Sequence, residues 1–295
     1  MAADCADPSP LFSIIVPVYR QWELVPDLLG ALGAQAPVRG GFEAILVDND
    51  PGADPGAAAP PALAPFARIM PCARPGSYAA RNLGAGAARG RWLVFTDADC
   101  LPEPGWLAAF AGEIAIGEAG LLAGPVRLRG ATPPNACEIY DIVRGIPQAR
   151  YVARGYAATA NLAVPRPVFE SLGGFDPARF SGGDAEFCRR AGRAGHGLRL
   201  VPGAVTWHPA RADWAALGDK ARRIKGWQIT AGPPARRAAW TLRTLCPPLG
   251  DLRAYLGAAE HPPAWRRSAA MTRLRLWGIE LAETLRLLGG GSPRR

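Results

Sequence analysis

No Cys-x-x-Cys pair occurs in this 295-residue sequence, and its six cysteines are scattered along the chain. This pattern argues against a zinc cluster or a disulfide framework, and it fits reduced thiols in a cytosol. The first ten residues have neither a positively charged region nor an apolar stretch, so we expect no signal peptide. No uncharged apolar run approaches the roughly 18 residues of a membrane span. We therefore expect a cytoplasmic protein.

Charge is distributed unevenly, and the formal net charge of +9 comes from the last part of the chain. From Arg211 to Arg295 there are 16 Lys and Arg residues against 6 Asp and Glu, whereas residues 1–210 carry 18 against 19. A basic tail favours contact with an anionic surface, such as lipid headgroups, nucleic acid or an acidic polymer. The alternative is a solvated basic face that keeps the protein soluble.

Strand and helix signals alternate over the first hundred residues. Apolar runs predict strands at 12–18, 42–47, 68–70 and 92–95. Helical patterns lie between them at 22–32 and 77–88, the second with Ser77 as N-cap, and residues 51–65 are typical of a loop. This alternation predicts a parallel sheet with helices on both faces.

The pattern becomes mixed after Pro102. We expect helices at 104–116, 166–172 and 182–194, and strands at 121–126, 158–164, 198–201 and 205–208. Gly232-Pro233-Pro234 is a plausible linker, and no internal repeat is present. The run Gly84 to Gly90 looks like a dinucleotide fingerprint, but it ends a predicted helix instead of opening one. It therefore predicts a helix end and a turn, which disfavours a nicotinamide oxidoreductase.

Two carboxylates, Asp97 and Asp99, directly follow the buried strand at 92–95. A strand can project both from its carboxyl end into one small volume, where two anions repel unless a cation lies between them. Mg²⁺ or Mn²⁺ suits this position, because such ions bind carboxylates and share phosphate oxygens. Asp48 and Asn49 end another predicted strand, so we expect the four side chains to converge. The alternative is a solvated turn at the end of the strand.

Six motifs in a fixed order resemble the family 2 glycosyltransferases, which have the GT-A fold. They are Ile14-Ile15-Val16-Pro17-Val18-Tyr19, Ile45-Leu46-Val47-Asp48-Asn49, Ala80-Arg81-Asn82-Leu83-Gly84, Phe95-Thr96-Asp97-Ala98-Asp99, Gly173-Gly174-Phe175-Asp176 and Gly183-Asp184-Ala185-Glu186-Phe187-Cys188-Arg189-Arg190. The resemblance covers about residues 12–210, and 211–232 is similar to some bacterial members.

That resemblance implies an α/β, Rossmann-like fold with a mixed, mostly parallel sheet flanked by helices. We expect a disordered N-terminus at 1–11 and a GT-A domain at 12–232, with a nucleotide-binding half at 12–100 and an acceptor half at 101–232. Residues 233–295 are expected to form a basic, mostly helical C-terminal extension.

The resemblance also assigns the metal ligands. It implies that Asp99 binds Mn²⁺ or Mg²⁺ directly, and that Asp97 contacts the metal's waters or the donor's ribose or sugar. The ion then bridges the donor diphosphate and stabilises the departing nucleoside diphosphate. His208 corresponds to a further ligand in some GT-A enzymes. A packed, hydrogen-bonded histidine is the alternative there.

Further positions correspond to the nucleotide site. Pro17, Tyr19, Asp48 and Asn49 match residues that line the base and ribose, and Asn49 stands where many members carry a second acid. An amide can donate as well as accept a hydrogen bond, so the identity of the base stays open. Arg81 suits a contact to phosphate or a base edge, although it could also be a helix-surface arginine.

Asp184 matches the catalytic base of this inverting family. The acceptor hydroxyl loses its proton as it attacks, and a carboxylate that takes the proton contributes about 10²–10⁴ in rate. The alternative is that Asp184 is only a helix N-cap. Gly183 departs from the common Glu-Asp pair, and Arg190, on the same helix as Glu186, is expected to be structural.

Residues 265–288 predict one helix. One face carries Leu274, Trp277, Leu281, Leu285 and Leu288, and arginines flank it. Residues 264–288 could therefore lie on an anionic membrane surface, at the inner face of the cell membrane. The alternative is that this face packs on the catalytic domain or on a second subunit.

Taken together, the resemblance implies a metal-dependent inverting transferase of hexosyl or deoxyhexosyl groups. Its donor would be a nucleoside-diphosphate sugar and its acceptor a saccharide or lipid-linked hydroxyl, in cell-surface polysaccharide or glycolipid synthesis. A non-catalytic sugar-nucleotide-binding or scaffold protein is the alternative, which the presence of Asp97, Asp99 and Asp184 disfavours. We expect no nucleic-acid partner, since the tail has no recognised motif.

Overall fold

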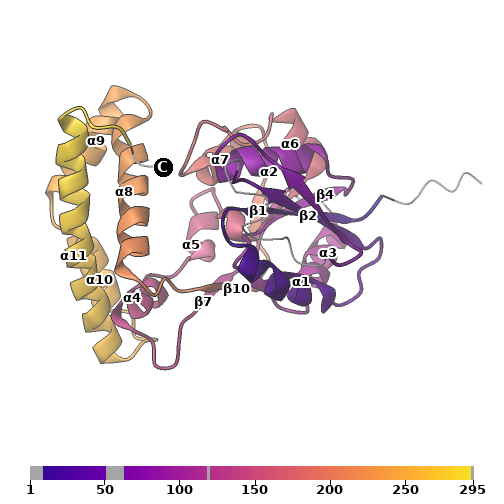
Figure 1. Cartoon of the computed structure of the whole chain (residues 1–295), viewed down its shortest axis with the longest axis horizontal. Coiled ribbons are helices and arrows are strands. Elements are labelled where there is room, and N and C mark those ends of the chain that lie inside the picture. The colour runs from indigo at the N-terminus through magenta and orange to yellow at the C-terminus, as the bar shows by residue number, and fades with distance from the viewer. Residues whose placement is uncertain (1–8, 51–62, 118–119, 294–295) are drawn as a thin grey trace, which may run out of the picture. The chain divides into compact units, whose positions relative to one another are not determined.

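A computed structural model describes residues 9–50, 63–117 and 120–293 of the chain. These residues form two compact units (Figure 1). Within the described residues, the first unit comprises Met1–Arg127 with Ile146–His208, and the second Leu128–Gly145 with Pro209–Arg295. The expected boundary after residue 232 falls inside the second unit, between two of its helices. Most of the expected N-terminal arm and of the loop at 51–65 lies outside the described residues.

The first unit contains a seven-stranded sheet. Its order is β3 (Ala67–Pro71), β2 (Phe42–Asp48), β1 (Phe12–Val18), β4 (Trp92–Phe95), β8 (Leu162–Pro165), β6 (Leu121–Ala123) and β9 (Leu198–Leu200). The first four strands are parallel, and β8 runs antiparallel to both β4 and β6. The carboxyl ends of β1, β2 and β4 therefore meet at one edge. The predicted mixed, mostly parallel sheet is confirmed.

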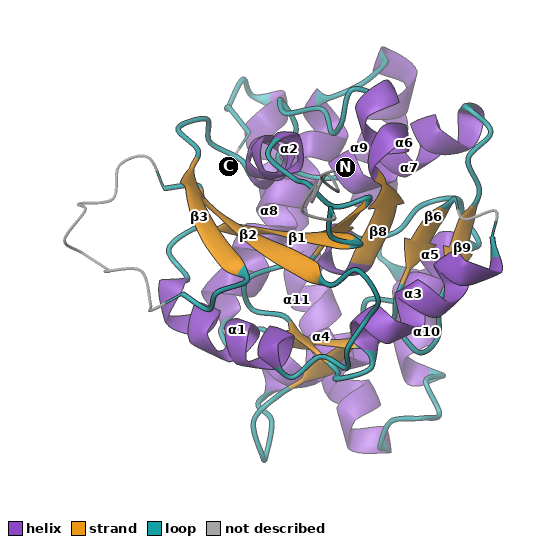
Figure 2. Ribbon diagram, turned by 90° about the vertical axis from the view of Figure 1, so that its right-hand side faces the viewer, coloured by secondary structure: helices purple, strands orange, loops and turns teal. Residues whose placement is uncertain are grey.

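Helices cover both faces of this sheet (Figure 2). On one face, α1 (Val25–Gly33) and α3 (Trp106–Ile116) pack their apolar residues against β1, β2 and β4. On the other face lie α2 (Ser77–Gly86), α6 (Arg166–Ser171) and α7 (Gly183–Arg193). The remaining short elements are η1 (Trp22–Leu24), α5 (Gln148–Val152), η2 (Thr159–Asn161) and a small sheet of β5 (Leu101–Pro102), β10 (Thr206–Pro209) and β7 (Val126–Arg129).

Three expectations about local structure are wrong. The strand expected at 158–164 begins only at Leu162, since Thr159–Asn161 form the 3-10 helix η2. Ser77 is not the N-cap of α2, because Gly76 holds that position with φ 116° and Ser77 is the first helical residue. The strand expected at 121–126 is two strands, β6 and β7, which belong to different sheets. The two strands are separated near Gly124, where a Cβ would lie 2.0 Å from the Ala204 carbonyl oxygen and 2.3 Å from Asn161 Nδ2.

The second unit is mainly helical, with α4 (Ala136–Arg144), α8 (Trp214–Thr230), α9 (Pro234–Leu245), α10 (Leu249–Leu256) and α11 (Pro263–Leu288). The long helix α11 runs beside α8 and also contacts α4, α9 and α10 (Figure 1). It buries Ala269 and Leu276 against Tyr140 and Leu217. The predicted helix at 265–288 is thereby confirmed.

The leucine and tryptophan face expected on α11 is partly buried in the protein and partly exposed to solvent. Trp277 is partly buried and donates its indole N–H to the Thr244 carbonyl oxygen, 2.8 Å away. Leu285 and Leu288, in contrast, are 63% and 60% exposed. Within the described ranges, no helix is both long and apolar enough to cross a membrane.

Close packing of α2 on the sheet depends on Gly84, and this dependence can be tested. A Cβ at Gly84 would lie 2.7 Å from Ile15 Cγ2 and 2.9 Å from Val47 Cγ2, whereas one at Gly86 meets nothing within 4 Å. We expect Gly84→Ala to lower the free energy of unfolding in urea by about 1–3 kcal/mol. The control Gly86→Ala, in the same helix, should be neutral or stabilising by up to about 1 kcal/mol. Equal effects of the two substitutions would refute this packing.

Candidate active site

The two carboxylates after β4 have different partners. Arg81, on α2, donates from Nη2 to Asp97 Oδ1, and its guanidinium also lies over the Tyr78 ring, 5.7 Å from the centroid. The Arg81 side chain is only 4% exposed, so the alternative of a helix-surface arginine is wrong. A buried guanidinium is stable only when paired, so Arg81 fixes the position of Asp97.

Asp99 lies beside a histidine. His208, at the end of the first unit, is 6% exposed and has Nε2 3.4 Å from Asp99 Oδ2. Asp97, Asp99 and Cys100 each offer one potential ligand atom, all within 4.8 Å of one another. Burial, with the two carboxylates, raises the pKa of the Cys100 thiol well above its usual value. The carboxylate oxygens, together with the neighbouring His208 imidazole, are a donor set that fits Mg²⁺ or Mn²⁺.

The residues expected around a nucleotide lie at the same edge of the sheet. Pro17 is partly buried in β1, Asp48 ends β2, and Tyr19 follows β1 with 53% exposure. Asp48 Oδ1 accepts a hydrogen bond from the Asp50 backbone N–H at 3.1 Å. The strand ends thus bring Tyr19, Asp48 and the acidic turn to one edge, while their roles toward a nucleotide stay predictions.

The side-chain amide of Asn49 forms hydrogen bonds with backbone groups of the protein. Its Nδ2 donates to the carbonyl oxygens of Cys72 and Arg74, at 3.3 and 2.7 Å, and its Oδ1 accepts from the Gly76 N–H at 2.8 Å. The side chain therefore holds the segment between β3 and α2. A carboxylate could not make the same set, because it only accepts hydrogen bonds. This is a physical reason for an amide instead of an acid at this position.

Asp184 is the second residue of α7, and the N-cap of that helix is Gly182 with φ 71°. The alternative that Asp184 is the N-cap is therefore wrong. Its backbone N–H donates to the Tyr78 hydroxyl at 3.3 Å, and its Oδ1 accepts from the Ala185 N–H at 2.8 Å. Burial raises the pKa of the Asp184 carboxyl; the Ala185 N–H and the charge of Arg81 oppose this only in part.

Tyr78 explains the glycine before Asp184. A Cβ on Gly183 would lie 2.7 Å from Cε2 of the Tyr78 ring, so this ring occupies the space that a larger residue would need. None of the sequence motifs assigns a role to Tyr78. Its spacing of three residues from Arg81 was an available signal, because such residues share one face of a helix.

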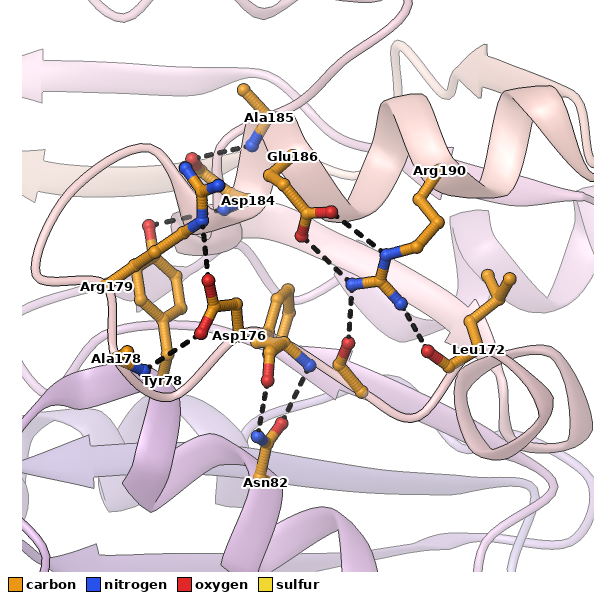
Figure 3. A network of polar contacts seen from close by, with 12 residues as sticks. Tyr78, Asn82, Leu172, Asp176, Ala178, Arg179, Asp184, Ala185, Glu186 and Arg190 are labelled. Atoms are coloured by element: carbon orange, nitrogen blue, oxygen red, sulfur yellow. Dashed lines mark hydrogen bonds and ion pairs between the residues drawn. The ribbon is translucent and has the colours of Figure 1, made fainter. Parts of the chain in front are cut away.

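Asn82 and Arg190 hold the Gly-Gly-Phe-Asp turn beneath α7 (Figure 3). Asn82 makes a reciprocal pair with the Phe175 backbone, donating to its oxygen at 2.7 Å and accepting from its N–H at 2.9 Å. Arg190 donates to the carbonyl oxygens of Leu172 and Gly174 and pairs with Glu186 at 2.9 Å. Helix α2 is thus joined to the acidic turn through Arg81, to Asp184 through Tyr78 and to this turn through Asn82.

Comparison with known proteins points to one family. Residues 13–136 match the model of the family described as glycosyl transferase family 2. Glycosyltransferase AglE of Haloferax volcanii is 31% identical over 223 residues, which cover 74% of this chain and 73% of that protein. A pre-mycofactocin glycosyltransferase of Mycobacterium tuberculosis is 29% identical over 151 residues; these cover 48% of this chain but only 32% of the relative.

Solved structures show the same fold at low sequence identity. The mannosyltransferase PcManGT from Pyrobaculum calidifontis, in complex with GDP-Man and Mn²⁺, has a TM-score of 0.57 and 21% identity, covering 92% of this chain and 87% of its own. Residues 1–349 of TarS from S. aureus, in complex with UDP-GlcNAc, have a TM-score of 0.52 and 15% identity, covering 96% and 93%. The GT-A fold expected from the sequence is confirmed.

The structural role of Arg190 can be tested against its neighbour Arg193. Lysine cannot reproduce the planar fork that reaches two carbonyl oxygens and Glu186, so Arg190→Lys should lower the free energy of unfolding by about 1–3 kcal/mol. Arg193→Lys, at an exposed position in the same helix, should change it by less than about 0.5 kcal/mol. Urea denaturation of both proteins provides the measurement. A neutral Arg190→Lys would mean that these contacts do not hold the turn.

Proposed function

Because the chain belongs to glycosyl transferase family 2, we propose that it moves a sugar from a nucleoside-diphosphate sugar to a hydroxyl acceptor with inversion at the anomeric carbon. The observation that carries this proposal is the position of Arg81. Its buried guanidinium pairs with Asp97 and its charge also acts on Asp184. With the contact of Tyr78, on the same helix, to the Asp184 backbone, this supports assigning the acidic turn and the start of α7 to one site.

The residues of this site have separate roles in the proposed reaction. Asp99 and His208 would hold a divalent ion, which when bound supplies Lewis-acid stabilisation of the departing diphosphate. Asp97 is kept in place by Arg81. Asp184 takes the proton of the acceptor hydroxyl as its oxygen bonds to the anomeric carbon and the bond from that carbon to the diphosphate breaks. Tyr78 positions Asp184 through its backbone.

The proposed substrates are inferred from the family resemblance and from the ligands named for the structurally similar proteins. PcManGT is named in complex with GDP-Man and TarS in complex with UDP-GlcNAc, which supports a nucleotide-sugar donor here. Tyr19 and Asp48 are the proposed contacts to the base and ribose. The acceptor is proposed to be a saccharide or lipid-linked hydroxyl of a surface polysaccharide or glycolipid. A non-catalytic binding protein would bind such donors without releasing nucleoside diphosphate.

Metal dependence can be tested through Asp99. With GDP-mannose and UDP-GlcNAc as donors, we expect slow release of nucleoside diphosphate that stops in EDTA and returns with Mn²⁺. Asp99→Asn should abolish the response to Mn²⁺, because an amide oxygen carries no charge for the ion. Asp27→Asn, the same change at an exposed position of α1, should behave like the unaltered protein. Full release in EDTA would disprove a metal-dependent reaction.

The base can be tested through the pH dependence of turnover. Asp184→Asn should lower turnover by about 10²–10⁴ while donor binding is retained. In the unaltered protein, activity should fall with decreasing pH as Asp184 becomes protonated, and its raised pKa places this loss above the range of an ordinary aspartate. Tyr78→Phe keeps the ring but removes a hydrogen bond that lowers this pKa, so the acid limb should move to higher pH. An unmoved acid limb would argue against this assignment.

A membrane contact through α11 is proposed for lipid-linked acceptors. Leu285 and Leu288 are exposed, and Arg267 and Arg275 are exposed arginines of the same helix. Arg273, in contrast, is paired with Asp251 and Glu280 and is less available to lipid. Exposed leucines and exposed arginines on one long helix suit an anionic interface.

This contact predicts the behaviour of the full chain in liposome flotation. The protein should float with anionic liposomes, and the combined change Leu285→Ser and Leu288→Ser should reduce the floating fraction. Leu256→Ser, at a leucine of α10 that is 50% exposed, is the control and should leave flotation unchanged. If the double variant floats as well as the control, α11 does not contact lipid through these leucines.

A further inference from the structure

An open pocket of about 490 Å³ lies in the first unit, at the edge where the parallel strands begin. Its lining comes from four segments that are distant in the sequence, and it includes Pro10 before β1, Gly41, Phe42 and Glu43 at the start of β2, Arg89 before β4 and Arg166 after β8. In the sheet, Phe12 is paired with Phe42 and with Trp92, and Trp92 is paired with Pro165. The starts of three parallel strands and the end of β8 therefore meet at this pocket.

The length of the sheet separates the pocket from the acidic turn. Strand β1 has seven residues, and at about 3.3 Å per residue its two ends lie roughly 20 Å apart. A small molecule in the pocket therefore does not reach the carboxyl ends of the strands, where Asp97 and Asp99 lie. The pocket is a second site, and its occupation does not depend on the proposed sugar transfer.

A buried carboxylate organises one wall of the pocket. Glu43 is 4% exposed, and its Oε1 accepts from the Ser13 hydroxyl and from the Arg89 backbone N–H, both at 2.7 Å. Its Oε2 lies 3.2 Å from Arg89 Nε and 3.4 Å from Arg68 Nη2. Burial alone would raise the pKa of Glu43, but these donors and the charge of Arg68 hold it below its usual value. The carboxylate is thus ionised, and it fixes the position of Arg89.

Two arginines line the pocket from different segments. The side chain of Arg89 is 62% exposed and that of Arg166 is 37% exposed, so solvent reaches both. Arg166 Nη1 donates to the Ala88 carbonyl oxygen at 3.4 Å, which places its guanidinium beside the residue that precedes Arg89. The contact of Arg89 with Glu43 is made through Nε, at one edge of its planar guanidinium. Two guanidinium groups are thereby held at one pocket.

The rest of the lining suits the body of a small organic molecule. Pro10, Phe42 and Ala88 are apolar residues of the lining, and a Cβ at Gly41 would meet nothing within 4 Å. Small-molecule sites typically measure about 300–1,000 Å³ and combine apolar residues with a few placed polar groups. A pocket of this size is larger than a bare phosphate ion needs.

We propose that this pocket binds a small organic phosphate, with its phosphate group on Arg89 and Arg166 and its organic part against Pro10 and Phe42. A guanidinium offers two parallel N–H donors to phosphate oxygens, and such charge-assisted hydrogen bonds are stronger than neutral ones. Glu43 is a positioning residue for Arg89, because both of its oxygens already accept hydrogen bonds within the protein. Binding requires neither a nucleotide nor a metal ion.

Titration calorimetry of the full chain with glucose 6-phosphate, in EDTA and without nucleotide, tests the proposal. Arg166→Gln should weaken binding about tenfold, because one charge-assisted contact is lost. Arg166→Lys keeps the charge and should retain part of the affinity. The control Arg199→Gln makes the same change at another arginine of the first unit, which is 46% exposed and lies 3.6 Å from Glu113. It should bind like the unaltered protein.

Two further ligands test which part of the molecule is recognised. Inorganic phosphate should bind more weakly than glucose 6-phosphate, because it leaves the apolar lining uncovered, and glucose should not bind. Inorganic phosphate binding as tightly would overturn the organic part of the proposal, and glucose binding as tightly would overturn the recognition of phosphate. The whole proposal is contradicted if the unaltered protein does not bind glucose 6-phosphate, or if Arg166→Gln and Arg199→Gln bind it equally.

Thermal unfolding separates a ligand site from a structural role. Glucose 6-phosphate should raise the unfolding midpoint of the unaltered protein and of Arg199→Gln, but not that of Arg166→Gln or Arg89→Gln. In Arg89→Gln, Glu43 keeps three donors, from Ser13, Arg68 and the backbone N–H of residue 89. If the ligand raises all four midpoints equally, it binds elsewhere. If Arg166→Gln lowers the midpoint without ligand yet keeps the ligand-dependent rise, Arg166 is structural and the proposal is wrong.

Discussion

The buried ion pair between Arg81 and Asp97 is the contact on which the geometry of the site depends. A guanidinium that is 4% exposed requires a carboxylate partner, so the pair fixes both the turn after β4 and the orientation of α2. The same helix face carries Tyr78 and Asn82, which bind the backbone of Asp184 and of Phe175. One helix thereby holds the turn after β4, the start of α7 and the Gly-Gly-Phe-Asp turn.

Separate environments give the acids of this site different chemistry. Asp97 is neutralised by Arg81, Asp99 lies beside His208, and Asp184 is desolvated next to Tyr78. A carboxylate held by an arginine can help to position a cation, whereas a desolvated one, such as that of Asp184, binds a proton more readily. This separation is what a reaction with a metal-stabilised leaving group and a proton-accepting base requires.

Much of the fold could be predicted from the sequence because its strands are short, continuous and strongly apolar. The strands at 12–18 and 92–95 have the predicted bounds. Predictions failed where a distant part of the chain decides the local conformation. Beside Gly124, where the expected strand is interrupted, Ala204 and Asn161 leave no room for a Cβ, and Gly76 replaces Ser77 as N-cap while its N–H donates to Asn49 Oδ1. No local pattern contains these partners.

Contacts between residues that are distant in the sequence also limit how much of the site can be predicted. Asp97, Asp99 and Asp184 stand in motifs, so they could be named in advance. The role of Tyr78 depends on its contact with Asp184, 106 positions later in the sequence. The role of Asn49 depends on its contact with a loop that begins 23 positions later, at Cys72.

The central claim is that a divalent ion joins the acidic turn to the diphosphate of a nucleotide. Calorimetric titration of the metal-free protein with UDP and with GDP, in the presence and absence of Mn²⁺, tests it most directly. The account predicts that at least one nucleotide binds with Mn²⁺ and that its affinity falls at least about tenfold without the ion, a difference of about 1.4 kcal/mol. Equal affinity with and without Mn²⁺ would contradict it.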